Sequence, residues 1–201
     1  MLESLDFVRH RLDLPGGTLG LLQPAEAAEL PDDGPIEWAP LVPYWAVLWR
    51  SGVALARELA EAPPAGLRVV ELGCGLGAPS LVAARAGATV LATDEAPEAL
   101  ELVRLNAREN GLGVATARVD WNAADDLIAR GPFDLALAAD VLYERPSVAL
   151  LLSLLPRLAR EVWLADPGRP AATAFLENAV RGWSVQSRLR DGMHVHRLRA
   201  R

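Results

Sequence analysis

The sequence predicts a single α/β domain built on a doubly wound, mostly parallel β-sheet that closes with a C-terminal antiparallel hairpin. From about Leu67 onward, short apolar runs alternate with helical patterns, which is typical of a parallel sheet covered on both faces. The dipeptide Asp191-Gly192 between the last two apolar runs signals a hairpin turn. A length of 201 residues suits one domain with a full core.

Seven short segments are expected to be strands because they are apolar and follow turn signals. They are residues 68–72, 89–94, 116–120, 133–140, 162–166, 183–188 and 194–198.

Three helices are clear from the spacing of apolar residues. Residues 51–60 form the first, and the second begins at Pro97 and is stopped by Gly111. Pro156 is expected to bend or end the third. That helix is predicted by apolar residues at i, i+3, i+4 and i+7, namely Val148, Leu151, Leu152 and Leu155.

The bulk composition predicts a cytoplasmic protein. Residues 1–43 are interpreted as an N-terminal arm with a short hairpin, followed by one domain over residues 44–201, without repeats. No apolar run is long enough to cross a bilayer, and the start of the chain lacks the pattern of a secretory signal. The single cysteine, Cys74, excludes an internal disulfide and a multi-cysteine metal site.

The charged residues argue against a nucleic-acid partner. All 20 basic residues are arginine, but the net charge is −6, so no global attraction to nucleic acid is expected. No metal site is expected either, because no acid or cysteine near His194 and His196 in the sequence completes a ligand set. A run of C-terminal arginines is interpreted as a solvated edge strand and tail rather than a phosphate-binding patch: Arg188, Arg190, Arg197, Arg199 and Arg201.

A glycine-rich turn follows the first expected strand and carries Gly73, Gly75 and Gly77. Asp94 ends the next strand, 21 positions beyond Gly73 (94 − 73). That spacing suits a carboxylate that accepts hydrogen bonds from ribose hydroxyls, which both NAD and S-adenosylmethionine (SAM) contain. The loop departs from the dinucleotide fingerprint G-x-G-x-x-G. It also follows Glu71, an acid that would repel pyrophosphate but suits the amino group of a methionine moiety, so the loop predicts SAM.

Two further acids follow later strands. Asp120 and Trp121 follow the third, where an adenine would lie; Asp120 either accepts from the exocyclic amine or caps a helix. Asp140 ends the fourth strand, and Tyr143 follows it. A carboxylate orients an incoming ammonium and an aromatic ring attracts it, which points to a cationic substrate. The alternative is that Asp140 caps the next helix and Tyr143 packs in the core.

These residues resemble the Rossmann-like class I (seven-β-strand) SAM-dependent methyltransferases. The closer likeness is to the protein-lysine methyltransferase family that includes the group modifying the β subunit of electron transfer flavoprotein. Besides the glycine loop, the likeness lies in residues 43–49 (PYWAVLW), 120–121 (DW), 140–143 (DVLY) and 166–169 (DPGR). Arg50 departs from the family, whose members usually have proline there.

The resemblance implies a role for each matching residue. Gly73, Gly75 and Gly77 would line the SAM site, Glu71 the methionine end, Asp94 the ribose, Asp120 with Trp121 the adenine, and Trp49 would cap the pocket. Asp140 and Tyr143 would form an acid-x-x-aromatic motif beside the transferred methyl. The product would be S-adenosylhomocysteine, and the partner a protein that presents lysine.

Alternative functions stay open from the sequence. A small-molecule N-methyltransferase has the same fold. A non-catalytic SAM-binding module or an NAD-dependent oxidoreductase would represent other classes. No membrane partner is expected.

Overall fold

The computed structural model describes residues 5–28 and 43–201. It confirms the α/β fold, with a seven-stranded sheet in the order β5-β4-β3-β6-β7-β9-β8 and a separate β1-β2 hairpin. Strands β3 to β7 are parallel, β9 runs antiparallel to β7, and β8 runs antiparallel to β9. The strands are β1 (Phe7–Leu14), β2 (Gly17–Pro24), β3 (Arg68–Leu72), β4 (Thr89–Asp94), β5 (Ala115–Arg118), β6 (Leu135–Ala139), β7 (Glu161–Asp166), β8 (Trp183–Arg190) and β9 (Met193–Ala200).

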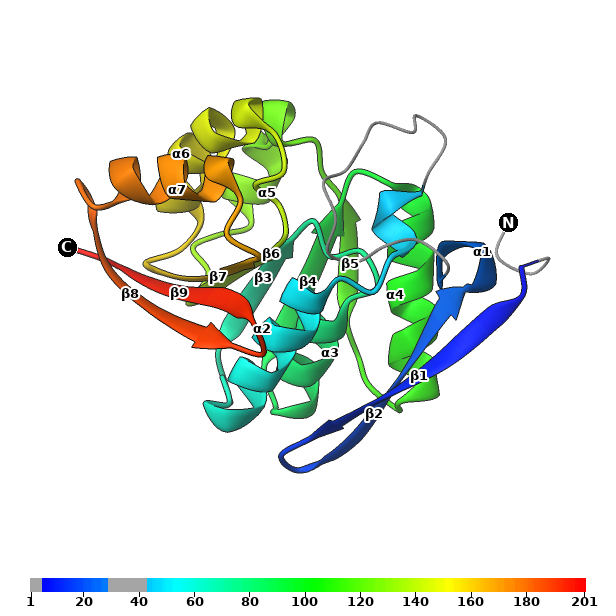
Figure 1. Cartoon of the computed structure of the whole chain (residues 1–201). Helices are drawn as coiled ribbons and strands as arrows, with labels where there is room; N and C mark the ends of the chain where they lie inside the picture. The colour runs from blue at the N-terminus through cyan, green and yellow to red at the C-terminus, as the bar shows by residue number, and fades with distance from the viewer. Residues whose placement is uncertain (1–4, 29–42) are drawn as a thin grey trace.

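Helices cover both faces of the large sheet, with α2, α3 and α4 on one face and α5, α6 and α7 on the other (Figure 1). Alternate residues of β3 serve the two sides: Val69 packs toward α2 and α3, and Val70 packs toward α6 and α7. The helices are α1 (Ala25–Ala28), η2 (Tyr44–Ala46), α2 (Arg50–Glu61), α3 (Ala78–Arg85), α4 (Pro97–Glu109), η3 (Trp121–Ala123), α5 (Asp125–Ala129), α6 (Arg145–Leu158) and α7 (Pro170–Ala179).

Three expected elements differ from the structure for a clear physical reason. Strand β5 ends at Arg118, because Asp120 instead caps the short helix η3. Strand β6 begins only at Leu135 and ends before Asp140, whose φ of 57° leaves the β region. Helix α6 continues through Pro156 to Leu158. The buried apolar face of α6, which includes Leu158, outweighs the backbone hydrogen bond that proline cannot donate.

The expected hairpin in the N-terminal arm is β1-β2, while residues 29–42 of that arm lie outside the described part of the chain. Asn106 of α4 and Asn110, the C-cap residue of that helix, bind the free edge of β2. Asn110 exchanges hydrogen bonds with both backbone groups of Gly20, and Asn106 does the same with Leu22. Asn106 Nδ2 also donates to the carbonyl of Leu76 at 3.2 Å. The hairpin is therefore connected to the glycine loop through one amide.

Strand β8 is an edge strand, as expected, but its arginines are not simply solvated. Glu58 of α2 is fully buried and accepts hydrogen bonds from Arg188, Arg190 and Arg197. Burial, followed by repulsion from the neighbouring guanidiniums, lowers the pKa of Arg188. The buried carboxylate of Glu58 thus holds the C-terminal hairpin against α2 by pairing with three arginines.

We expect Glu58→Gln to lower the free energy of unfolding by about 3–5 kcal/mol, because Arg197 would lose its carboxylate partner and Arg188 and Arg190 would keep only the more exposed Glu61. Urea denaturation followed by tryptophan fluorescence measures the loss. The matched control is Glu61→Gln, whose side chain is 46% exposed and whose loss is expected to stay below about 1 kcal/mol. Equal losses in the two variants would contradict the central role of Glu58.

Candidate functional site

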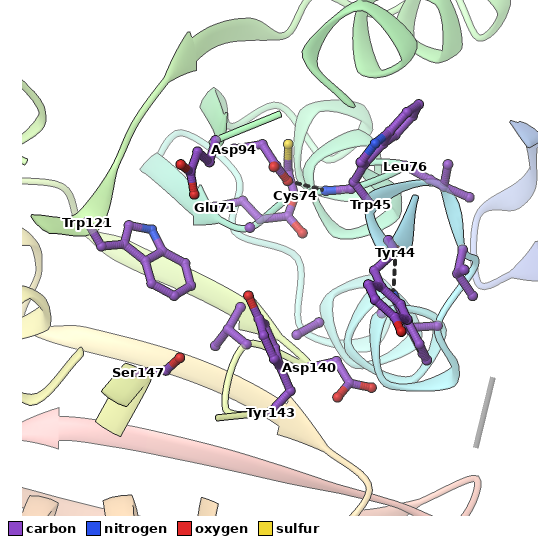
Figure 2. Close-up of a pocket in the computed structure, with 18 of the residues that line it drawn as sticks. Tyr44, Trp45, Glu71, Cys74, Leu76, Asp94, Trp121, Asp140, Tyr143 and Ser147 are labelled. Carbon is purple, nitrogen blue, oxygen red and sulfur yellow. Dashed lines mark hydrogen bonds between the residues drawn. The ribbon is translucent and has the colours of Figure 1, made fainter. Parts of the chain in front are cut away.

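A cavity of about 590 Å³ lies at the carboxyl ends of β3, β4, β5 and β6. Ligands of doubly wound sheets bind in the crevice at this edge, where the strand order reverses; here β3 lies between β4 and β6. All ten residues predicted for the site line this cavity. Figure 2 shows five of them around it, namely Glu71, Asp94, Trp121, Asp140 and Tyr143.

The glycine loop forms one wall, and its backbone leaves no room for side chains. Gly75 has a φ of 49°, and a Cβ there would lie 3.0 Å from the carbonyl oxygen of Trp45. Gly77 has a φ of 78°, and its Cβ would lie 2.8 Å from Val103 Cγ2. Both positions combine a left-handed backbone with a close approach, which only glycine allows. Gly77 therefore packs the loop against α4 as well as lining the cavity.

Glu71 is buried beneath the loop at the end of β3, with 1% of its surface exposed. Its Oε2 accepts hydrogen bonds from the backbone N–H of Ser80, at 2.9 Å, and from the Ser80 hydroxyl. Burial raises the pKa of Glu71 to about 8, against the opposing effect of the Ser80 hydrogen bonds. A cation beside Glu71 would favour the ionised carboxylate.

Asp94 fixes the glycine loop from the end of β4. Its Oδ2 accepts from the N–H of Gly75 and its Oδ1 from the N–H of Ala96, both at 3.0 Å. Burial raises the pKa of Asp94, and these backbone hydrogen bonds oppose the rise. Each carboxylate oxygen has a second lone pair, so Asp94 still has capacity to accept from a hydroxyl in the cavity.

Asp120 and Trp121 form the opposite wall. Asp120 Oδ1 accepts from the backbone N–H of Asn122 at 2.8 Å, which is the helix-capping alternative, and this bond is the main cause that lowers the pKa of Asp120. Both residues nevertheless line the cavity. The ring of Trp121 faces the loop so closely that a Cβ on Gly73 would lie 3.6 Å from its Cζ2.

Aromatic side chains close the cavity on the side of η2 and α2. Trp49 Nε1 donates to the carbonyl of Tyr44 at 3.0 Å, and the two rings stack with centroids 6.5 Å apart. This contact fixes the segment that precedes α2 over the cavity.

Asp140 lies at the cavity floor and does not cap α6, whose N-cap residue is Glu144. Arg169 Nε donates to Asp140 Oδ1 at 2.7 Å, and Ser51 Oγ donates to Oδ2 at 3.2 Å. The carboxylate is 5% exposed and the arginine side chain 15%.

Tyr143 stands at the rim. It is 54% exposed, which rules out the core-packing alternative. Burial of its inner part raises the pKa of the phenol, and the charges of Glu144, Asp94 and Glu95 raise it further. A second cavity of about 450 Å³ lies beyond Tyr143 and is also lined by Arg145 and Arg169.

The charge of the main cavity is one-sided. Among the described residues that line it, six carry a carboxyl group and none carries a guanidinium. The six are Glu71, Asp94, Glu95, Asp120, Asp140 and Glu144.

Sequence reasoning did not identify Ser51, Ser80 or the contact of Arg169 with Asp140. Of these, only Arg169 could have been found from the sequence, because it is the last residue of the segment 166–169 that resembles the methyltransferase family. Cys74 is buried, and burial raises the pKa of its thiol well above the usual value, so a reactive thiol is not favoured. Within the described ranges, no three His, Cys, Asp or Glu side chains gather as a metal site would require. Nor does any helix there have the length and hydropathy needed to cross a membrane.

A family model described as lysine methyltransferase matches residues 45–163, more than half of the chain. The electron transfer flavoprotein beta subunit lysine methyltransferase of Xenopus laevis is 40% identical over 136 residues, which are 63% of this chain and 53% of that protein. Protein N-lysine methyltransferase METTL21A of Danio rerio is 36% identical, over 57% of this chain and 55% of that protein. The chain thus spans about half the length of these relatives.

A solved structure shares the fold. The T. thermophilus 16S rRNA N2 G1207 methyltransferase RsmC, in complex with AdoMet and guanosine, aligns with a TM-score of 0.70 at 16% identity. The alignment covers 100% of this chain and 52% of that one.

The pKa of Glu71 makes stability depend on pH. Between the ordinary value of 4.5 and about 8, the carboxyl ionises in the unfolded chain but stays protonated in the fold. The unfolded state then binds fewer protons, so the free energy of unfolding falls as pH rises through this window, by up to about 1.4 kcal/mol per unit. We expect Glu71→Gln to gain stability relative to the wild type from pH 5 to pH 8. Urea denaturation across this range measures the difference, and a constant difference would contradict the raised pKa.

Proposed function

The chain belongs to the lysine methyltransferase family, and we propose that it transfers a methyl group from SAM to the ε-amine of lysine in a partner protein. The β subunit of electron transfer flavoprotein is the first candidate, because a relative 40% identical to this chain is named as the lysine methyltransferase of that subunit. The cytoplasmic location expected from the sequence remains part of this proposal.

The one-sided charge of the main cavity is the observation that carries the proposal. SAM has a sulfonium and an ammonium, and lysine has an ammonium, so both reactants suit a cavity lined by six carboxyl groups and no guanidinium. The pyrophosphate of NAD would instead meet these acids without a cation to balance it. The charge therefore favours SAM over the oxidoreductase alternative.

The residues around the cavity fit SAM part by part. Glu71 lies beneath the glycine loop and suits the methionine ammonium. Asp94 retains acceptor capacity for the ribose hydroxyls, and the free Oδ2 of Asp120 suits the adenine amine. Trp121 offers its ring face to the adenine, and Trp49 belongs to the segment that covers the cavity.

Bound SAM supplies a methyl group that is already activated by the sulfonium. The chain's own residues must then align the acceptor amine and keep it neutral. Lysine has a reference pKa of about 10.4, so its ammonium must lose a proton to solvent before the nitrogen can attack the methyl group. Loss of hydration and the nearby sulfonium of SAM favour the neutral amine, against the opposing effect of the carboxyl groups. Asp140 at the floor and Tyr143 at the rim would attract the arriving ammonium and direct its nitrogen inward.

We expect Asp94→Ala to weaken SAM binding by roughly ten- to a hundredfold, since charge-assisted hydrogen bonds contribute on the order of 1.5–3 kcal/mol. Calorimetry with SAM, S-adenosylhomocysteine and NADH measures the affinities. Asp126→Ala is the matched control, because Asp126 is exposed on α5 and outside the cavity. Unchanged SAM affinity in folded Asp94→Ala would remove Asp94 from the site, and tighter binding of NADH than of SAM would overturn the cofactor.

The acceptor is tested with labelled SAM and recombinant flavoprotein β subunit. We expect methyl-lysine by mass spectrometry with the wild-type enzyme. We expect none with Asp140→Asn, which should still bind SAM because the carboxylate is assigned to the amine. The enzyme contains no lysine, so every methyl-lysine originates from the added protein.

Three results would contradict this assignment. Methylation that persists after every target lysine is replaced by arginine would exclude lysine as the acceptor. Activity on free small amines alone would favour a small-molecule N-methyltransferase. SAM binding without transfer to the subunit or to a host lysate would favour a non-catalytic binding module.

A further inference from the structure

Both oxygens of Asp140, the residue that follows β6, are held by residues far away in the sequence. Arg169, in the loop between β7 and α7, donates to Oδ1 at 2.7 Å, and Ser51, in the first turn of α2, donates to Oδ2 at 3.2 Å. The two groups come from positions 29 residues after and 89 residues before Asp140. The direction of this carboxylate is therefore set by tertiary structure.

The backbone at Asp140 explains why such support is needed. Its φ of 57° is in the left-handed region, which a residue with a Cβ adopts at a cost of roughly 1–3 kcal/mol. Its N–H still donates to the carbonyl of Ala165 at 2.9 Å, so the backbone is fixed against β7. A conformation of this kind persists only where surrounding contacts determine it.

The loop that carries Arg169 is itself anchored. Asp166 Oδ1 accepts from the N–H of Gly168 at 2.6 Å and from the N–H of Arg169 at 3.1 Å. Asp166 Oδ2 lies 3.1 Å from His196 Nε2, and the Asp166 side chain is 1% exposed. Strand β9 thus fixes the turn, and the turn fixes Arg169.

We propose that Arg169 is a positioning residue that holds the Asp140 carboxylate in the orientation that receives the acceptor amine. The inference rests on the proposed function and adds a residue to it. A guanidinium suits this role because its N–H groups are held in one plane and point in fixed directions, whereas an ammonium on a flexible stem does not. Buried ion pairs contribute little net stability relative to apolar packing, so the pair is better explained by orientation than by folding.

The second cavity makes the proposal testable by chemical rescue. Arg169 lines that cavity, together with Tyr143 and Ala174. In Arg169→Ala, a small guanidinium cation can therefore reach the vacated space beside Asp140 through this opening.

The test compares wild-type enzyme with Arg169→Ala on the recombinant flavoprotein β subunit. We expect kcat to fall roughly a hundredfold, as for a displaced catalytic group, with SAM affinity unchanged by calorimetry. Millimolar methylguanidinium should restore part of the lost kcat. It should restore nothing in Asp140→Asn, because the carboxylate to be positioned is absent. Arg157→Ala, which removes an exposed pair with Asp125, is the matched control and should keep wild-type kcat.

Arg169→Lys serves if the alanine variant does not fold. It keeps the positive charge but lacks the Nε–H group. We therefore expect its kcat to lie between that of the wild type and that expected for Arg169→Ala. Wild-type kcat in either variant would overturn the inference. So would a loss accompanied by weaker SAM binding and no rescue, which would mark a purely structural arginine. A wild-type enzyme that binds SAM but leaves the subunit unmethylated would overturn the proposed function, and this inference with it.

Discussion

Three of the carboxyl groups that line the cavity, those of Glu71, Asp94 and Asp140, are largely withdrawn from water, and the architecture around the cavity depends on holding them there. Like charges at short range repel strongly where water is excluded. Each buried acid is therefore given donors by a different neighbouring segment: Ser80 for Glu71, the N–H groups of Gly75 and Ala96 for Asp94, and Arg169 with Ser51 for Asp140. Glu71, with the pKa raised to about 8, shows that this compensation is incomplete without a cation.

The two halves of the cavity are assembled differently. The wall assigned to SAM comes from Glu71 to Trp121, over three successive strands and the loops that follow them. Because residues at the ends of successive parallel strands meet at one edge of the sheet, their separation along the sequence indicates their position in the fold. The glycine loop and Asp94 were predictable for this reason. Asp140 lines the cavity on the side assigned to the acceptor and is held by Ser51 and Arg169, and no sequence period connects residues that far apart.

The difference between contacts of neighbouring segments and contacts of distant segments also explains which features of the fold were missed. The strand segments along the chain and the final hairpin followed from apolar runs and from Asp191-Gly192, whose positive φ values fit the turn. The contacts of Glu58 with three arginines were not predictable, because α2 and the hairpin are more than 100 residues apart. The strand-like pairing of Asn106 with β2 was equally hidden, since asparagine in a helix signals nothing by itself.

The family model covers one side of the cavity more fully than the other. The matched segment ends at residue 163, so it includes the whole glycine-loop wall and Asp140 but neither Arg169 nor β9. At the start of α2, next to Ser51, Arg50 stands where members of the family usually have proline. Proline there would serve only as the first residue of a helix, whereas Arg50 also donates to the carbonyl of Asp191 in the hairpin turn at 3.2 Å. Ser51 next to it contacts Met193 as well as Asp140. Ser51, which holds Asp140, is therefore in contact with the C-terminal hairpin, and that hairpin lies beyond the segment that the family model matches.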